Sequence, residues 1–547
     1  MEKNYKEWII GLALSALALM VYANTLVNGF VQDDSYIILK NRAFHDGILS
    51  LFRAIDTDPT QLLPFYRPLT YMTFFVEKKA HGFDPLFMHG CNVILHAANV
   101  FLVYLLGLSV LKGRRAALLA GALFAVHPIN AESVNYLSGG RNTMLACFFV
   151  LAAFLLHQRS IITNRFILCI AGALLFLAAL FSKEMALMLL PVLLGLELRN
   201  SWKGGVEART KAAVRMAPYL PAAGVYLVMR WQTLSAAGIQ KSIIPGFGMQ
   251  KLATLYSIPN FGERMQNNLF ILPKYLLTII WPASLSPRYA MPGDLPLRGV
   301  LLAITWGCIV AVAAWIVLRR ENRAERFGLI WGVAFWLPIS GVVYFSNIVM
   351  ADRYLYLPAI GIWIAVAGQF DKVIRSRSRM VGSAVAVGAV LILILSAGMT
   401  LKRNCDWKDE RALFTKMTDL YPDNAYGYYY LGAAYLIPPD MADPQRAEKY
   451  LERALALDDS LPSVHTLLGY IRLQSGNFES AAQLLTEALR RNPADGEARI
   501  NRGTTYENMG RYQDALKDYE FALSTADDEY LPGSREYAAR KVKELRR

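Results

Sequence analysis

Long apolar runs alternate with short polar segments through the first 400 or so residues of the chain. Residues 9–30 and 86–111 are clear examples, and each is long enough for a helix that crosses a bilayer, which takes about 20 residues. The pattern predicts an all-α transmembrane helix bundle over residues 1–402. We count about eleven crossings and one further helix that is re-entrant or interfacial.

Basic residues cluster in the short loops between these apolar runs, and the richest loop holds Arg199, Lys203, Arg209, Lys211 and Arg215. Such loops lie in the cytoplasm under the positive-inside rule. The N-terminus is then cytoplasmic, and the first loop, residues 31–85, lies outside. The apolar stretch 269–281 does not fit this orientation as an ordinary crossing, so we interpret it as the re-entrant or interfacial helix. The odd number of crossings also puts the C-terminal tail outside.

The polar tail, residues 403–547, carries an internal repeat. Gly469 and Gly503 are 34 residues apart, and Gly432 precedes Gly469 by 34 residues plus a short insertion. Small residues recur at matching places in each second helix, as Ala447/Ala454, Ala481/Ala488 and Ala515/Ala522. This spacing is typical of tetratricopeptide repeats, in which small residues let paired helices approach closely. We predict three repeats in an α-solenoid.

Composition narrows the possible functions. The chain has 547 residues, of which 54% are hydrophobic, and a net charge of +14. The tail after residue 400 has 21 basic and 24 acidic residues, so the membrane body alone carries about +17 in its loops. A charge in cytoplasmic loops is not a nucleic-acid-binding face. The five cysteines are isolated and show no zinc or disulfide pattern.

Two adjacent carboxylates, Asp33 and Asp34, follow the first apolar run. Charges near hydrocarbon cost free energy and are commonly functional. Because neighbouring carboxylates repel, one should have a raised pKa while the other stays ionised, which suits a general base. A helix cap or a surface turn is the alternative interpretation. Which of the two would be the base stays open.

A general base near a membrane would suit the transfer of a group from a lipid phosphate, and such a reaction also needs cations to stabilise the departing phosphate. Arginine matches phosphate oxygens with two parallel hydrogen bonds, and the preferred candidates are Arg141, Arg353 and Lys183. Arg141 follows two glycines, where a tight turn could add backbone N–H groups. Lys183 is followed by Glu184, so a local ion pair is the alternative there. Arg67 lies in an aromatic segment suited to the membrane interface, and we predict that it binds substrate.

Two further polar groups stand out. His127, Asn130 and Glu132 follow a short apolar run, where Pro128 should stop or bend the helix and turn them to an outer aqueous cleft for substrate binding. His89, Asn92, His96 and Asn99 share one helix face at spacings of three and four. We favour hydrogen bonding between helices over a metal or sugar site for this face. No metal site is predicted.

Together, these motifs give the chain a resemblance to a known family. It resembles the transmembrane and tetratricopeptide-repeat O-mannosyltransferase-like proteins of the GT-C glycosyltransferase superfamily. The residues that carry it run in order along nearly the whole chain: Asp33-Asp34 with Asn41, Tyr66 to Thr70, Asn92 to Ala97, His127 to Glu132, Gly140-Arg141, Ser182 to Glu184, Trp281-Pro282 with Leu285-Ser286, Arg353 to Pro358 and Asp406-Trp407.

The resemblance implies a GT-C-type bundle and an inverting transferase. The donor would be a polyprenyl- or dolichyl-phosphate monosaccharide, typically mannose, and the acceptor a hydroxyl group, often of protein Ser or Thr. It makes Asp33 or Asp34 the base and puts Arg141 and Arg353 near the donor phosphate. No cofactor besides the lipid-linked donor is certain, and a divalent metal stays open. Asn130 and Asn142 depart from the family pattern, which leaves the sugar and the acceptor open.

The repeats suggest the partner. Tyr426, Tyr429 and Tyr470 should face the concave groove, where aromatics suit a protein or glycan acceptor, although ordinary helix packing is an equal alternative. A non-catalytic membrane scaffold and a cell-envelope oligosaccharide ligase are the competing functions. We expect an integral protein of the bacterial inner membrane, or of the endoplasmic reticulum in a eukaryote.

Overall fold

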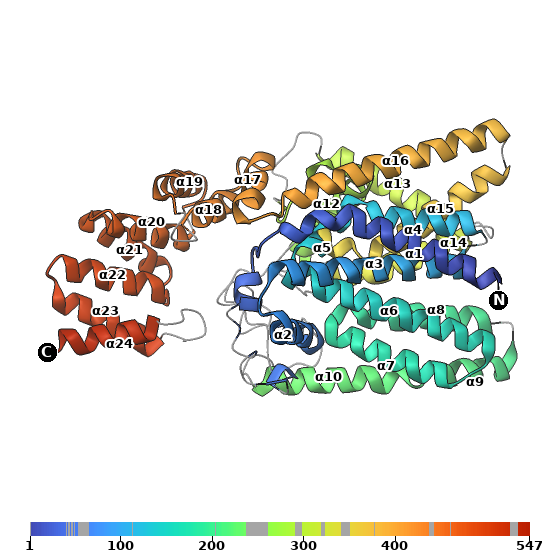
Figure 1. Ribbon diagram of the computed structural model, residues 1–547, viewed down its shortest axis with the longest axis horizontal. Coiled ribbons are helices and arrows are strands. Elements are labelled where there is room, and N and C mark those ends of the chain that lie inside the picture. The colour runs from blue at the N-terminus through green and yellow to red at the C-terminus, as the bar shows by residue number, and fades with distance from the viewer. Residues whose placement is uncertain are drawn as a thin grey trace. The chain divides into compact units, whose positions relative to one another are not determined.

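The computed structural model is built from helices (Figure 1). It divides into two compact units, a membrane body (residues 1–39 and 43–408) and a tail (residues 40–42 and 409–547). The residues that the structure describes are 2–39, 41, 44, 47–48, 50–52, 65–111, 113–202, 204–236, 261–289, 298–318, 323–340, 350–376, 378–436, 442–459, 461–525 and 534–547. The first loop predicted at 31–85 therefore lies partly outside the described residues.

The body is a bundle of α-helices. Their bounds are α1 Glu2–Tyr22, α2 Pro68–His81, α3 Pro85–Val110, α4 Arg114–Val126, α5 Ala131–Asn135, α6 Leu137–Thr163, α7 Ile167–Ser182, α8 Leu189–Ser201, α9 Gly205–Met216, α10 Tyr219–Ala236, α12 Phe261–Ile280, α13 Arg298–Leu318, α14 Arg323–Trp336, α15 Pro358–Ser376 and α16 Arg379–Cys405. Helices α1, α3 and α4 lie side by side, and α7 packs between α6 and α10 (Figure 1).

Several helices can cross a membrane. Within the described residues, five are long and apolar enough, and a sixth arises if α4 and the bent segment after it count as one span. The eleven crossings predicted from the sequence are therefore not confirmed. The stretch predicted to be re-entrant or interfacial falls mostly in α12, a 20-residue helix that contains Pro273.

The bend after α4 has a local cause. Helix α4 ends at Val126, just before His127-Pro128. Proline ends the helix because it has no N–H for the helical hydrogen bonds and its ring clashes with the preceding turn. The 3-10 turn η5 (Pro128–Asn130) and α5 continue at an angle of 51°. The predicted effect of Pro128 is thus confirmed. The bend turns Glu132 into the bundle.

The tail consists of helix pairs that match the predicted repeats. The pairs are α18 Ala425–Ala434 with α19 Pro444–Leu457, α20 Pro462–Gln474 with α21 Phe478–Arg491, and α22 Gly496–Asn508 with α23 Tyr512–Thr525, flanked by α17 Glu410–Leu420 and α24 Ser534–Leu545. The six alanines at the repeat positions are fully buried. A Cβ added at Gly469 would lie 2.6 Å from Leu485 of the partner helix. Small residues therefore set the helix spacing.

Candidate active site

The two adjacent carboxylates occupy different environments. Asp34 is fully buried, and its carboxylate accepts hydrogen bonds from the backbone N–H groups of Ser138 at 2.8 Å and Val31 at 3.1 Å. Ser138 is in the first turn of α6, so Asp34 caps that helix and holds the loop after α1 against it. Burial raises the pKa of Asp34 to about 7 despite these hydrogen bonds. Both of its oxygens are thus committed to the backbone.

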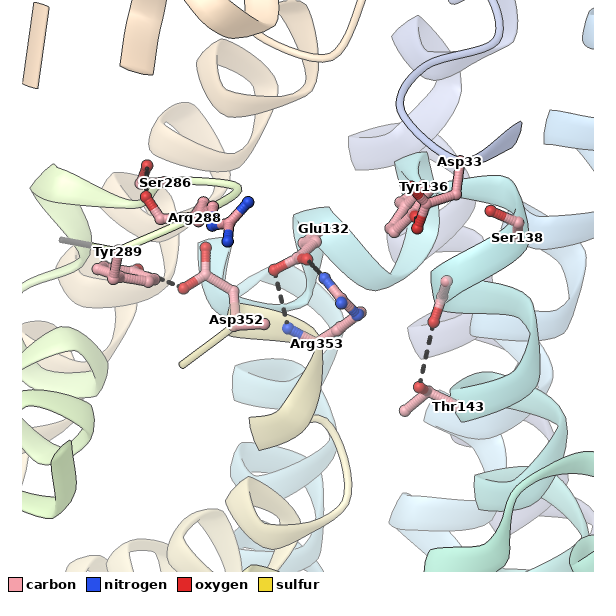
Figure 2. Close-up of polar contacts among 12 residues, drawn as sticks. Asp33, Glu132, Tyr136, Ser138, Thr143, Ser286, Arg288, Tyr289, Asp352 and Arg353 are labelled. Atoms are coloured by element: carbon pink, nitrogen blue, oxygen red, sulfur yellow. Dashed lines mark hydrogen bonds and ion pairs between the residues drawn. The ribbon is translucent and has the colours of Figure 1, made fainter. Parts of the chain in front are cut away.

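Asp33 is only half buried, and it points to a different partner. The hydroxyl of Tyr136 donates a hydrogen bond to its carboxylate at 2.6 Å (Figure 2). The ring of Tyr136 stacks on Trp407, with ring centroids 5.9 Å apart and an angle of 22°. Trp407 is completely buried, so the ring that holds the hydroxyl is fixed by packing. Asp33 is consequently the less buried of the two carboxylates, and Tyr136 gives it a defined orientation.

A buried ion pair lies next to this tyrosine. Glu132, brought in by α5, binds the guanidinium of Arg353 and accepts a hydrogen bond of 3.0 Å from its backbone N–H (Figure 2). Arg353 is in the turn η9 (Asp352–Leu355) that precedes α15. Its guanidinium carbon lies 5.3 Å from the ring centroid of Tyr136 and 5.1 Å from that of Tyr354. Tyr136 therefore contacts both Asp33 and a cation.

Lys183 continues this group of cations. It follows the end of α7, is 5% exposed, and donates a hydrogen bond of 2.6 Å to Thr143. Its ammonium lies 5.5 Å from the ring centroid of Tyr354. Burial, with the nearby charge of Arg67, holds the pKa of Lys183 well below its ordinary value. A bound anion would stabilise its charged form.

Glu184 does not pair with its neighbour Lys183, which was the alternative considered from the sequence. It pairs with Arg67 instead. Arg67 binds Glu184 through two hydrogen bonds of 2.9 and 3.3 Å, and both side chains are buried. Glu184 begins the turn η6 (Glu184–Met188). Burial alone would raise its pKa, but Arg67 and other nearby cations hold it at about 2, so Glu184 is ionised. Lys183 is left with a hydroxyl partner.

A second acidic group lies beside the Glu132–Arg353 pair. Asp352 is fully buried and accepts a hydrogen bond from Tyr289, close to Arg288 and Ser286 in Figure 2. Arg403 approaches its carboxylate at 3.9 Å. Burial and the charge of Glu132 raise the pKa of Asp352 to about 8 against the effect of Arg403. Burial thus favours the protonated form of this carboxyl.

Other predicted site residues lie in bundle contacts. Arg141 is 2% exposed, binds Glu77 and Asn92, and donates a hydrogen bond of 3.0 Å to the carbonyl of Met88. His127 is bonded to the carbonyl of Ile279 at 3.0 Å. The expected outer aqueous cleft is not observed at His127 or Glu132, because both are buried. The bend buries them instead of turning them outward.

The amide of Asn130 donates to the carbonyl of Phe124 at 2.8 Å, so its side chain also closes the turn after α4. The polar face of α3 is likewise buried, and its four members bond to other segments: His89 to Gly29, Asn92 to Val134, His96 to Tyr356 and Asn99 to Met144. The prediction of hydrogen bonding between helices is confirmed for this face. No three His, Cys, Asp or Glu side chains of the described residues come together as a metal site would require.

Comparisons with known proteins agree with the fold of the tail and extend to the body. A tetratricopeptide-repeat family model matches residues 439–495 and 466–530. Protein O-mannosyl-transferase Tmtc1 of Drosophila melanogaster is 30% identical over 77% of this chain and 59% of its own length. Protein O-mannosyl-transferase F38B6.6 of Caenorhabditis elegans is 28% identical over 84% of this chain and 64% of itself. The predicted resemblance is confirmed.

The match covers most of this chain but only part of each O-mannosyl-transferase. Human TMTC3 is 25% identical over 95% of this chain and 55% of itself, so the chain spans slightly more than half the length of these relatives. Among solved structures, the archaeal oligosaccharyltransferase AglB from Archaeoglobus fulgidus covers 78% of this chain and 60% of itself at 15% identity. Its TM-score of 0.41 is too low to establish a shared fold.

Two residues of this site were not among the candidates read from the sequence as functional. Tyr136 carries no local motif, and only the packing of α6 brings it to Asp33. Trp407 belongs to the Asp406-Trp407 pair that the O-mannosyl-transferase resemblance includes, which was the one signal for it. In the tail, Tyr426 is 38% and Tyr470 36% exposed, while Tyr429 is half buried and packs edge-to-face on Tyr430.

Proposed function

We propose that this chain is a membrane glycosyltransferase that moves one sugar, mannose, from a polyprenyl-phosphate carrier to a hydroxyl acceptor. The acceptor side, the first loop and the repeats would all be extracytoplasmic, in a bacterial inner membrane or the endoplasmic reticulum. The names of its relatives support the reaction and the sugar. The resemblance to this family suggests the lipid-phosphate carrier, and a carboxylate near buried cations is compatible with a hydroxyl acceptor and a phosphate leaving group.

The observation that carries the proposal is the double contact of Tyr136. Its hydroxyl binds Asp33 and its ring lies against Arg353, so one side chain links a carboxylate to a buried cation. A sugar transfer from a phosphate needs this combination. A base must take the acceptor proton, and positive charge must stabilise the departing phosphate.

In the proposed reaction, Asp33 takes the proton of the acceptor hydroxyl as its oxygen attacks the anomeric carbon. The bond between that carbon and the phosphate oxygen breaks, and its electron pair leaves with the phosphate. Arg353 and Lys183 stabilise the charge that develops there. A single displacement inverts the configuration at the anomeric carbon. Asp34 takes no part in proton transfer, because both its oxygens bind backbone N–H groups.

The tail would present the acceptor. Tyr426 and Tyr470 expose more than a third of their surface at the repeats, which suits contact with a protein segment or a glycan. Tyr429 contributes less surface, because it is half buried. A protein acceptor with Ser or Thr hydroxyl groups fits the names of the relatives better than a glycan does.

Isosteric variants test the reaction. Purified protein in lipid is incubated with radiolabelled polyprenyl-phosphate mannose and peptide acceptors. We expect Asp33→Asn to lower the transfer rate about 10²- to 10⁴-fold, as loss of a general base does, without lowering the unfolding temperature. Asp34→Asn should keep most of the activity, since an amide oxygen still accepts a hydrogen bond from Ser138.

The same assay separates the competing functions. Transfer that survives in the Asp33→Asn/Asp34→Asn double variant contradicts the proposed base. If the wild-type protein consumes no donor with any acceptor, the non-catalytic scaffold replaces the transferase. The configuration of the product, read by NMR of the anomeric proton, tests inversion separately.

A further inference from the structure

Beside the Arg67–Glu184 pair, helix α10 contributes a cation that the reaction above does not use. Arg230 is 6% exposed and lies in one of the candidate membrane spans, residues 205–235. Its Nη1 has no hydrogen-bond partner among the described residues. An ionisable side chain inside a membrane helix costs free energy unless it is paired, and such residues commonly mark a path or a site.

Two phenols share this unsatisfied state. Tyr226 lies one turn before Arg230 on α10, and its ring centroid is 6.2 Å from that of Tyr66, which precedes α2. Both tyrosine hydroxyls are buried. That of Tyr226 lies beside the Arg230 guanidinium and that of Tyr66 beside the side chain of Thr233, but neither makes a well-formed hydrogen bond to a described residue. The Arg230 guanidinium and two phenols are therefore gathered here, and their hydrogen-bonding capacity is only partly met by the described residues. Buried polar groups are normally satisfied, so this cluster needs an explanation.

The local charge points to an anion. Arg67, Arg230 and Lys183 all act on the single carboxylate of Glu184, and together they lower its pKa. Arg67 takes both oxygens of that carboxylate. Arg230 and Lys183 thus remain without a carboxylate partner among the residues described here. When both are charged, this group of side chains carries two positive charges more than negative ones. Buried excess charge of this kind is stabilised by an ion of opposite sign.

The surroundings point to an anion carried on a lipid. Phe181 lies 6.1 Å from Tyr226 and 6.3 Å from Tyr66 between ring centroids, so the cluster has an aromatic wall. Helix α10 packs on α7 with one face (Figure 1) and exposes Val225, Val228 and Trp231 on another. Exposed apolar residues on a candidate membrane span suit contact with lipid chains. The cluster therefore lies on a helix whose other face can contact the acyl chains of a lipid.

We infer that Arg230, Tyr226 and Tyr66 bind the phosphate group of a lipid phosphate, with Lys183 completing its charge. Naming this ligand as the polyprenyl-phosphate donor rests on the proposed function, whereas the phosphate chemistry does not. Arginine and phenol groups donate to phosphate oxygens, and the low dielectric strengthens both contacts. The site lies next to Lys183, which the proposed reaction already assigns to the donor phosphate.

Direct binding tests the site without the sugar-transfer reaction. The full chain in nanodiscs is titrated with undecaprenyl phosphate that carries no sugar, and binding is followed by native mass spectrometry. We expect Arg230→Gln to weaken binding roughly 10- to 100-fold and Tyr226→Phe several-fold, as loss of a charged and a neutral hydrogen bond predict. Tyr219→Phe is the matched control, since it removes another buried, unpartnered hydroxyl from α10 and should leave binding unchanged.

Stability supplies a second measurement. Tyr226→Phe removes an unsatisfied buried hydroxyl, so the unfolding temperature without ligand should stay equal or rise while lipid-phosphate binding weakens. A fall of both, with the same fall in Tyr219→Phe, would show a packing role and overturn the inference. If Arg230→Gln does not fold, Tyr226→Phe and Tyr66→Phe carry the test.

Three titrations in parallel identify the ligand. Binding of undecaprenyl phosphate well above phosphatidylglycerol and inorganic phosphate supports the inference. Equal binding of phosphatidylglycerol, or of inorganic phosphate alone, overturns it. If the wild-type enzyme is active but the Arg230→Gln variant binds undecaprenyl phosphate normally, the proposed site is wrong and the transferase function stands. Arg230-dependent binding without any sugar transfer leaves the site and refutes the transferase.

Discussion

Two kinds of ion pair, one from the tail and one from the body, use charge in opposite ways. In the tail, ion pairs such as Glu487–Arg490 and Asp514–Arg511 join residues that are three apart in the sequence and at least partly exposed. In the body, Glu132 pairs with Arg353 across 221 residues, and both are buried. Local surface pairs add little to stability, while breaking a buried pair leaves an uncompensated charge. The charge of the Glu132–Arg353 pair is therefore tied to tertiary structure and, in our proposal, to chemistry.

The strongest test of this difference is Glu132→Gln. It leaves Arg353 buried without its carboxylate, and we expect a loss of about 3–5 kcal/mol in the free energy of unfolding. Thermal unfolding in detergent measures it. Glu487→Gln in the tail is the matched control and should leave the unfolding temperature unchanged, because its partners stay solvated. Equal effects of the two substitutions would contradict the comparison.

A pH series tests the buried carboxylate of the body. The pKa of Asp34 is raised from 3.8 to about 7, so the folded chain binds a proton more tightly than the unfolded chain. Its contribution to stability is then fully present below about pH 4 and is lost as the pH rises through about 7. The change is on the order of 4 kcal/mol, at 1.36 kcal/mol per pKa unit.

Asp34→Asn cannot titrate, so its unfolding temperature should fall less between pH 4 and 7 than that of the wild-type protein. Parallel curves for the two proteins would show that Asp34 is ionised in the fold without cost.

The smallest effect concerns helix packing. A Cβ at Gly469 in the tail would lie 2.6 Å from Leu485, so Gly469→Ala should destabilise α20 and α21 by about 1–3 kcal/mol through overpacking. Gly398→Ala in α16 adds a methyl group where no atom lies within 4 Å, and should be neutral or stabilising. Hydrogen exchange of the full chain reports on α20 and α21 directly. Unchanged exchange in Gly469→Ala would mean that Leu485 moves freely.

The tail was predictable because its packing repeats locally. The glycines and alanines spaced by 34 residues mark the helix contacts, and the structure buries all six of those alanines. The bend at Pro128 was predictable for the same reason, since a proline acts on its own turn. The number of crossings was not, because hydropathy does not say how short or bent helices such as α4 and α7 combine.

The candidate site was predictable in residue type but not in pairing. The single ring of Tyr354 lies near both Lys183 and Arg353, whereas Arg141 forms an ion pair with Glu77. No residue near Arg141 in the sequence predicts its pairing with Glu77, which lies 64 residues away on another helix. Pairing depends on which helices pack together, and a single sequence does not reveal that.

The sequence by itself determined the helices, the repeats and the presence of carboxylates and cations beside apolar segments, because these follow from side-chain polarity and short-range spacing. Only the tertiary structure separated Asp33 from Asp34. The two residues are adjacent and chemically identical, yet one is bound to the backbone of α6 and the other to Tyr136. Burial and hydrogen-bond partners come from segments a hundred residues away, so they exist only once the chain has folded.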